Sequence, residues 1–102
     1  FVYNSKNDVG DSILDFSGVT ANNDHFEFNG TNFGGLAAGN LAVNQFQKST
    51  SDTAFTADVR FFYETDTNTL WFDQDGLGGV AAITIAVLQP GADVFRGDIL
   101  IV

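Results

Sequence analysis

The sequence predicts an all-β fold: a single antiparallel-rich β-sandwich or β-roll-capping domain of about seven short strands with little helix. Short runs of aromatic and β-branched residues alternate along the chain with clusters of Gly, Asn and Asp, which is typical of strands joined by turns. Eleven of the 13 acidic residues are Asp, whereas Glu and Lys, which favour helix surfaces, are scarce. Eleven Phe in 102 residues fit one ring-rich core in one domain.

The N-terminal part contains three short apolar runs. Residues 1–3 are expected to form a strand, and a second strand is expected at 12–16 after a polar turn. Residues 25–28 alternate polar and apolar side chains with a period of two. Phe26 and Phe28 are therefore expected to point into the core.

The middle of the chain combines one ambiguous stretch with a hairpin. Residues 34–48 place apolar side chains at a helix-compatible spacing after several small residues, which predicts a short helical turn or an ordered loop. Residues 58–64 are rich in aromatic side chains, and the turn residues 65–68 connect them to a second aromatic run at 69–72. This pattern predicts a β-hairpin.

The C-terminal part holds the most apolar strands. Residues 81–88 are apolar apart from Thr84, so this strand is expected to be central in its sheet or covered on both faces. Pro90-Gly91 should end it. A turn or helical stub at 92–97 and a final apolar strand at 98–102 complete the predicted elements.

Charge and composition exclude several classes of function. Four basic and 13 acidic residues give a net charge of −9, which repels nucleic-acid phosphates and anionic lipid headgroups. No apolar run has the length of a membrane span. The chain begins with Phe rather than Met and has no signal peptide, so we expect it to belong to a longer polypeptide with upstream domains.

Catalysis is not expected. The absence of Cys removes disulfides, thiolate metal sites and thiol nucleophiles, and a single His does not support most acid–base schemes. Neither a serine-hydrolase elbow, a zinc-protease motif nor a phosphate-binding loop is present in the sequence. We therefore predict a protein that is not an enzyme.

The turn after the second aromatic run carries the chemistry that is most suggestive of a ligand. Asp73 and Asp75 are two residues apart and are followed by Gly76, which can adopt a positive φ and let the backbone double back. Carboxylate and carbonyl oxygens around one centre are the ligands that calcium prefers. The same residues are also ordinary hairpin-turn residues, so the sequence leaves both a calcium site and a plain turn open.

Three segments together resemble the C-terminal module of repeats-in-toxin (RTX) proteins, calcium-binding polypeptides exported by type I secretion that include serralysin-type proteases. The segments are Asp11-Ser12-Ile13-Leu14-Asp15-Phe16 with the following 24–28, then 70–78, and finally 93–95 with 98–102. The resemblance covers nearly the whole chain. The glycine- and aspartate-rich nonapeptide repeats of that family are not present in this sequence.

The resemblance implies a secreted, extracellular or cell-surface module that is noncatalytic, associated with calcium and placed after a repeat region that it caps. Asp11 and Asp15 would then lie near the junction where the last ions bind, although solvated strand-end carboxylates explain them equally well. The implied partner is the type I secretion apparatus. The implied secretion signal lies in the last strand, at Asp98, Ile99, Leu100, Ile101 and Val102.

Two other functions remain open at this stage. Residues 1–3 and 99–102 lack guarding Lys or Pro, so as edge strands they would allow self-association into an extracellular layer or fibre. A carbohydrate-binding β-sandwich is a weaker alternative, with Trp71, Tyr3 or Tyr63 as the aromatic contact.

Overall fold

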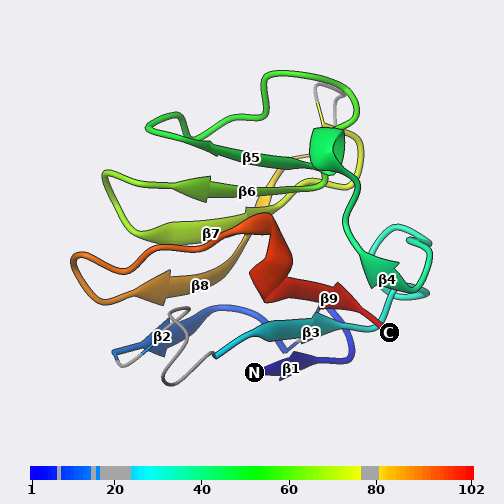
Figure 1. Cartoon of the computed structure of the whole chain (residues 1–102), viewed down its shortest axis with the longest axis horizontal. Coiled ribbons are helices and arrows are strands. Elements are labelled where there is room, and N and C mark those ends of the chain that lie inside the picture. Colours follow the sequence, from blue (N-terminus) through cyan, green and yellow to red (C-terminus); the bar gives the residue numbers. More distant parts are fainter. Residues whose placement is uncertain (7, 15, 17–23, 77–80) are drawn as a thin grey trace.

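The computed structural model describes residues 1–6, 8–14, 16, 24–76 and 81–102, and its fold is all-β with two sheets (Figure 1). The described residues form nine strands and two 3₁₀ helices of three residues each. The strands are β1 (Val2–Tyr3), β2 (Asp11–Ile13), β3 (Phe26–Phe28), β4 (Gly39–Asn40), β5 (Phe46–Ser49), β6 (Phe61–Glu64), β7 (Thr69–Phe72), β8 (Ile83–Leu88) and β9 (Ile99–Ile101), and the helices are η1 (Val43–Gln45) and η2 (Arg96–Asp98).

The strands are distributed over a four-stranded and a five-stranded sheet. The first sheet has the order β1-β3-β9-β4, and the second has the order β2-β8-β7-β6-β5. The predicted hairpin is confirmed as β6 and β7, with Asn68 in its turn at a φ of 54°. The strand predicted at 81–88 is confirmed as β8 and lies in the interior of its sheet, between β2 and β7.

The expected antiparallel character is wrong, because four of the seven strand pairings are parallel. The reason is that several strands that follow one another in sequence belong to different sheets. Parallel strands need a crossover connection, and β1 and β3 have one, because the chain passes through β2 in the other sheet between them. A hairpin pattern in a sequence predicts only those antiparallel pairs whose strands follow one another in the chain.

The short helical turn predicted within 34–48 is confirmed as η1, but the stretch also holds β4 and the first part of β5, which raise the strand number from about seven to nine. β5 pairs in parallel with β6, with Phe46 opposite Phe61. This pairing joins two segments through tertiary contact, and the local spacing of apolar residues does not encode it.

The first three strands form one coil that passes through both sheets. The chain runs along β1 in the first sheet, crosses to β2 in the second and returns to β3, which pairs in parallel with β1. The Tyr3 hydroxyl donates a hydrogen bond of 2.9 Å to Oδ2 of Asp11, so β1 and β2 are in direct contact across the coil. Both strands are sheet edges and lie along the lower side of Figure 1.

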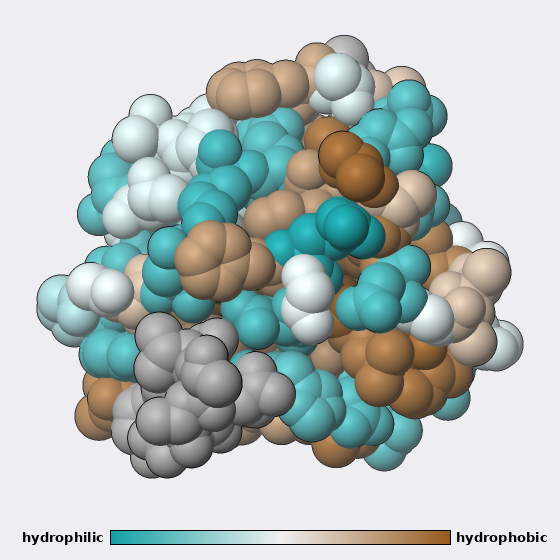
Figure 2. Space-filling model, viewed as in Figure 1, coloured by the Kyte–Doolittle hydropathy of each residue, from teal (hydrophilic) through white to brown (hydrophobic). Residues whose placement is uncertain are grey.

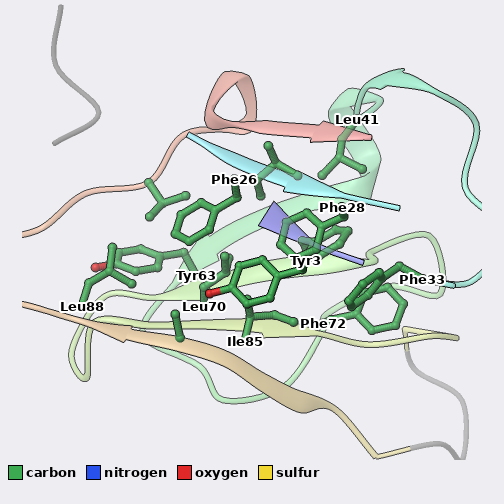
Figure 3. Close-up of a cluster of buried hydrophobic side chains, with 14 of the residues drawn as sticks. Tyr3, Phe26, Phe28, Phe33, Leu41, Tyr63, Leu70, Phe72, Ile85 and Leu88 are labelled. Atoms are coloured by element: carbon green, nitrogen blue, oxygen red, sulfur yellow. The ribbon is translucent and has the colours of Figure 1, made fainter. Parts of the chain in front are cut away.

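Apolar side chains of both sheets meet in the main core (Figure 3), and a smaller cluster of Ala54, Val59 and Phe62 is separate from it. Phe26 and Phe28 are fully buried, as predicted. The ring centroids of Phe28 on β3 and Phe61 on β6 lie 4.5 Å apart, and those of Phe33 and Phe72 lie 5.3 Å apart in an edge-to-face arrangement. Because the first pair joins the two sheets and the second joins the segment after β3 to β7, aromatic packing holds the sheets together.

The C-terminal strand is an interior strand, and the expectation that residues 99–102 form an open edge is therefore wrong. β9 pairs with β3 on one side and with β4 on the other. Ile99 and Ile101 are buried. Their apolar side chains reach the core only from this central position, which leaves β1 as the one terminal strand at an edge among the described residues.

Candidate functional site

The acidic turn, residues 73–76, begins directly after β7. The backbone N–H of Asp73 donates to the carbonyl of Arg60 at 2.8 Å, so the turn continues the pairing between β6 and β7. Oδ1 of Asp73 accepts a hydrogen bond of 3.2 Å from the N–H of Asp75. Asp73 is only 6% exposed, whereas Asp75 is half-buried. The turn therefore places one carboxylate inside the protein and a second one beside it.

Gly76 fixes the path of the acidic turn. Its φ is +65°, and the backbone carbonyls of Thr56 and Ala57 occupy the place where a β-carbon would lie. A β-carbon at this position would lie 2.8 Å from both the carbonyl carbon and the oxygen of Ala57. Only glycine adopts this positive φ readily and also leaves room for the neighbouring carbonyls. The contact with residues 56–57 brings main-chain oxygens from a distant segment to the turn, and no sequence signal indicated it.

The environment of Asp73 disfavours its negative charge. Burial raises the pKa of Asp73 above its ordinary value of 3.8, and the Asp75 carboxyl raises it further through a hydrogen bond and through charge repulsion. The N–H groups of Asp75 and Gly76 lower the pKa and oppose part of this shift. A divalent cation at the turn would favour the ionised form of Asp73.

The acidic turn offers ligand atoms of the type that calcium prefers. Calcium takes six to eight oxygen ligands from carboxylates, carbonyls and waters. Asp73 and Asp75 offer carboxylates, and the nearby Thr56 and Ala57 carbonyls already accept hydrogen bonds from the Val59 N–H and the Arg60 guanidinium. Among the described residues, no three acidic or histidine side chains gather to hold a metal. A calcium ion here would therefore depend on two carboxylates completed by carbonyls and water.

A shallow hollow lies beside the acidic turn. Its volume is about 40 Å³, and its lining consists of Lys6, Phe72, Gln74, Ala81 and Ile83. Nζ of Lys6 donates to Oε1 of Gln74 at 2.8 Å and lies 5.7 Å from the ring centroid of Phe72. Pockets that bind organic ligands typically have volumes of about 300–1,000 Å³, so this hollow is much smaller than a ligand pocket.

Asp11, another predicted calcium ligand, is not part of the acidic turn. Asp11 lies on the edge strand β2, is exposed and accepts the hydrogen bond from Tyr3. Asp15 lies outside the described residues. The structure therefore brings together Asp73 and Asp75 and leaves Asp11 with a tyrosine partner.

The predicted secretion signal is built into the fold. Asp98 is 7% exposed, and its carboxylate accepts a hydrogen bond of 2.9 Å from the N–H of Phe95, which closes the short helix η2. Burial raises the pKa of Asp98 above its ordinary value, and the nearby Asp93 adds to the shift. β9 follows immediately and lies inside its sheet. In the folded protein this segment is therefore structural.

The aromatic residues suggested for carbohydrate contact do not form a platform. Tyr3 and Tyr63 are each 1% exposed, which corrects their assignment to an accessible face. The Tyr63 hydroxyl donates to the carbonyl of Ala92 at 2.8 Å, and burial raises the pKa of Tyr63 to about 12. Trp71 is half-buried, stacks on Phe62 and donates its indole N–H to Glu64. The indole nitrogen of Trp71 therefore already has a hydrogen-bond partner within the protein.

Comparison of the chain with protein-family models, curated proteins and solved structures found no match. In the part of the chain that the structure describes, no helix is long and apolar enough to cross a membrane.

Proposed function

We propose that this chain is a noncatalytic, calcium-associated C-terminal module of an extracellular RTX-like protein, with the architecture of a β-roll cap. The observation that carries the proposal is the acidic turn, where a buried Asp73 is held beside Asp75 and has a raised pKa. Removing a carboxylate from water beside a second one is costly without a counterion. Calcium would supply that counterion.

The charge of the whole chain supports a calcium-dependent fold. With a net charge of −9 on 102 residues, self-repulsion opposes compaction, and each bound Ca²⁺ removes two units of it. Extracellular modules typically bind calcium at about 10⁻⁴–10⁻³ M, which is above cytosolic concentrations. The chain would remain unfolded before export and fold outside the cell.

The position of β9 determines when residues 98–102 could act in export. A secretion apparatus can recognise this segment only before folding, because Ile99 and Ile101 are buried afterwards. Deleting 98–102 is expected to abolish export of the parent protein. Since the deletion also removes an interior strand, Phe28→Ala is the control: it weakens the core, leaves the segment intact and should permit export.

The calcium assignment is tested by thermal unfolding with 10 mM calcium or with a chelator. For a dissociation constant of roughly 10⁻⁴–10⁻³ M, binding to the folded state stabilises it by about 1.4–2.7 kcal/mol. For a domain of this size, that corresponds to a rise in Tm of roughly 6–20 °C. The double variant Asp73→Asn/Asp75→Asn should lose most of the rise.

The matched control is Asp52→Asn/Asp66→Asn, which makes the same change in charge at two exposed positions. It should keep the calcium response of the original chain. An identical Tm in calcium and chelator would refute calcium association altogether. Equal responses of the two double variants would remove Asp73 and Asp75 as ligands.

A second candidate function is an extracellular layer or fibre subunit, and the edge position of β1 favours it. Phe1 and Val2 are 45% and 59% exposed at that edge. Light scattering at high protein concentration in calcium separates the two functions. Ordered polymers would favour the subunit, whereas a monomer would argue against it.

A further inference from the structure

The chain leaves β3 through Asn29-Gly30, the only Asn-Gly pair in the sequence. Gly30 is buried, and the backbone oxygen of Leu36 occupies the place where its β-carbon would lie. That β-carbon would also come within 2.7 Å of Cγ2 of Ile101. A side chain at this position would force its neighbours apart. The fold therefore requires a glycine directly after Asn29.

An asparagine followed by glycine is chemically labile, because glycine has no side chain to hinder an attack by its own nitrogen. The Gly30 nitrogen loses its proton to water and attacks Cγ of Asn29. A new N–Cγ bond closes a succinimide ring, and the bond from Cγ to the side-chain nitrogen breaks. That nitrogen takes up a proton and leaves as ammonia. Water then opens the ring at either carbonyl, which gives Asp or isoaspartate and adds one negative charge.

The folded structure holds both polar groups of the peptide between Asn29 and Gly30. Its N–H donates to the carbonyl of Val102 at 3.1 Å, which continues the pairing of β3 with β9. Its C=O accepts hydrogen bonds from the N–H groups of Asn32 and Phe33, at 3.0 and 3.1 Å. The attacking nitrogen has to give up the first of these bonds, and the peptide has to turn against the other two. Both changes oppose deamidation in the folded chain.

The Asn29 side chain is also held, although water can reach it. Its Oδ1 accepts a hydrogen bond of 3.1 Å from the N–H of Thr31, a turn that asparagine commonly forms with its own backbone. Asn29 is half-buried and Thr31 is exposed. Hydrophilic side chains cover much of the face seen in Figure 2, where apolar ones form separate patches. Protection of Asn29 therefore depends on its hydrogen bonds and not on a dry surrounding.

We propose that Asn29 is a deamidation site that reacts in the unfolded chain and is protected by folding. The hydrogen bond from Gly30 to Val102 separates the two states, because it forms only when β9 lies beside β3. The reaction then proceeds at a rate set by the fraction of time that this part of the chain is open. The inference involves neither calcium nor a partner, so it goes beyond the proposed function.

Deamidation at this position would limit how long the chain can stay unfolded and still fold. In isoaspartate the main chain runs through the former side chain and is one carbon longer before Gly30. This insertion moves the Gly30 N–H away from Val102 and presses Gly30 toward Leu36. The Asp product keeps the original backbone, and its carboxylate can accept the same hydrogen bond from Thr31. The isoaspartate form is therefore the one that no longer fits the fold.

Mass spectrometry tests the proposal on the 102-residue chain, aged in mildly alkaline buffer with or without urea and then digested. In urea, Asn29 should deamidate faster than the other asparagines, and Gly30→Ala should slow its reaction. In the folded chain, the reaction at Asn29 should be about tenfold or more slower than in urea. An equal rate at Asn29 with and without urea would overturn the proposal.

Pro90→Asn is the matched control, because it creates a second Asn-Gly pair in a turn where Pro90 and Gly91 are both exposed. The N–H of Ala92 closes this turn by donating to the Gln89 carbonyl, so the turn does not depend on the Gly91 N–H. The new pair should deamidate in the folded chain at a rate close to its rate in urea. Equal protection of both pairs by folding would refute the role of the bond to Val102.

The folding consequence is measured on the separated isoaspartate form, with Asn29→Asp as the control that changes the charge alone. Urea denaturation should show a lower midpoint for the isoaspartate form than for Asn29→Asp. Equal midpoints would refute the limit on refolding, and the deamidation rates would then stand or fall by the first experiment.

Discussion

Replacing Gly76 by Ala tests whether the acidic turn is held by its contact with residues 56–57. The left-handed conformation, at a φ of +65°, costs an L-residue about 1–2 kcal/mol. The added methyl group would also collide with the backbone carbonyls of Thr56 and Ala57, and such overpacking costs typically about 1–3 kcal/mol. The two costs sum to about 2–5 kcal/mol of lost unfolding free energy.

Gly35 provides the matched control, because its φ is +69° and nothing lies within 4 Å of an added β-carbon. Gly35→Ala should therefore incur only the conformational cost. Urea denaturation of both variants in calcium measures the difference, which we expect to be about 1–3 kcal/mol. Gly76→Ala should also weaken the calcium response, since it displaces Asp73 and Asp75. Equal destabilisation by the two substitutions would refute the role of the contact.

Two further predictions concern the buried groups. In chelator, Asp73 and Asp98 have folded-state pKa values above the ordinary 3.8. At pH values between 3.8 and these raised pKa values, the folded state therefore binds more protons than the unfolded state. Their contribution to stability therefore rises as pH falls from neutrality toward 3.8. Asp73→Asn should flatten this pH dependence of the unfolding free energy, measured by urea titrations. An unchanged slope would contradict the raised pKa of Asp73. Phe28→Ala should lower the unfolding free energy by about 3–5 kcal/mol, because Phe28 is fully buried among four aromatic rings. Phe55→Ala, at a side chain that is 59% exposed, should change it by less than about 0.5 kcal/mol. Similar losses in the two variants would contradict the packing described for the core.

The candidate site could be predicted only in part. Asp73, Asp75 and Gly76 were recognisable because they are adjacent in sequence, and local turn chemistry depends on neighbours. The burial of Asp73, the contact between Gly76 and residues 56–57, and the hydrogen bond from Lys6 to Gln74 join distant segments. Nothing in the local pattern encodes such contacts.

The sequence by itself determined the all-β class, the β6–β7 hairpin and the inward direction of Phe26 and Phe28, because alternation and turn residues act over a few positions. Tertiary structure alone decided that β5 pairs in parallel with β6, that β9 is an interior strand and that β1 and β2 are edges. Strand order is set by which apolar faces fit together across the whole core, and this choice is made among segments far apart in the chain.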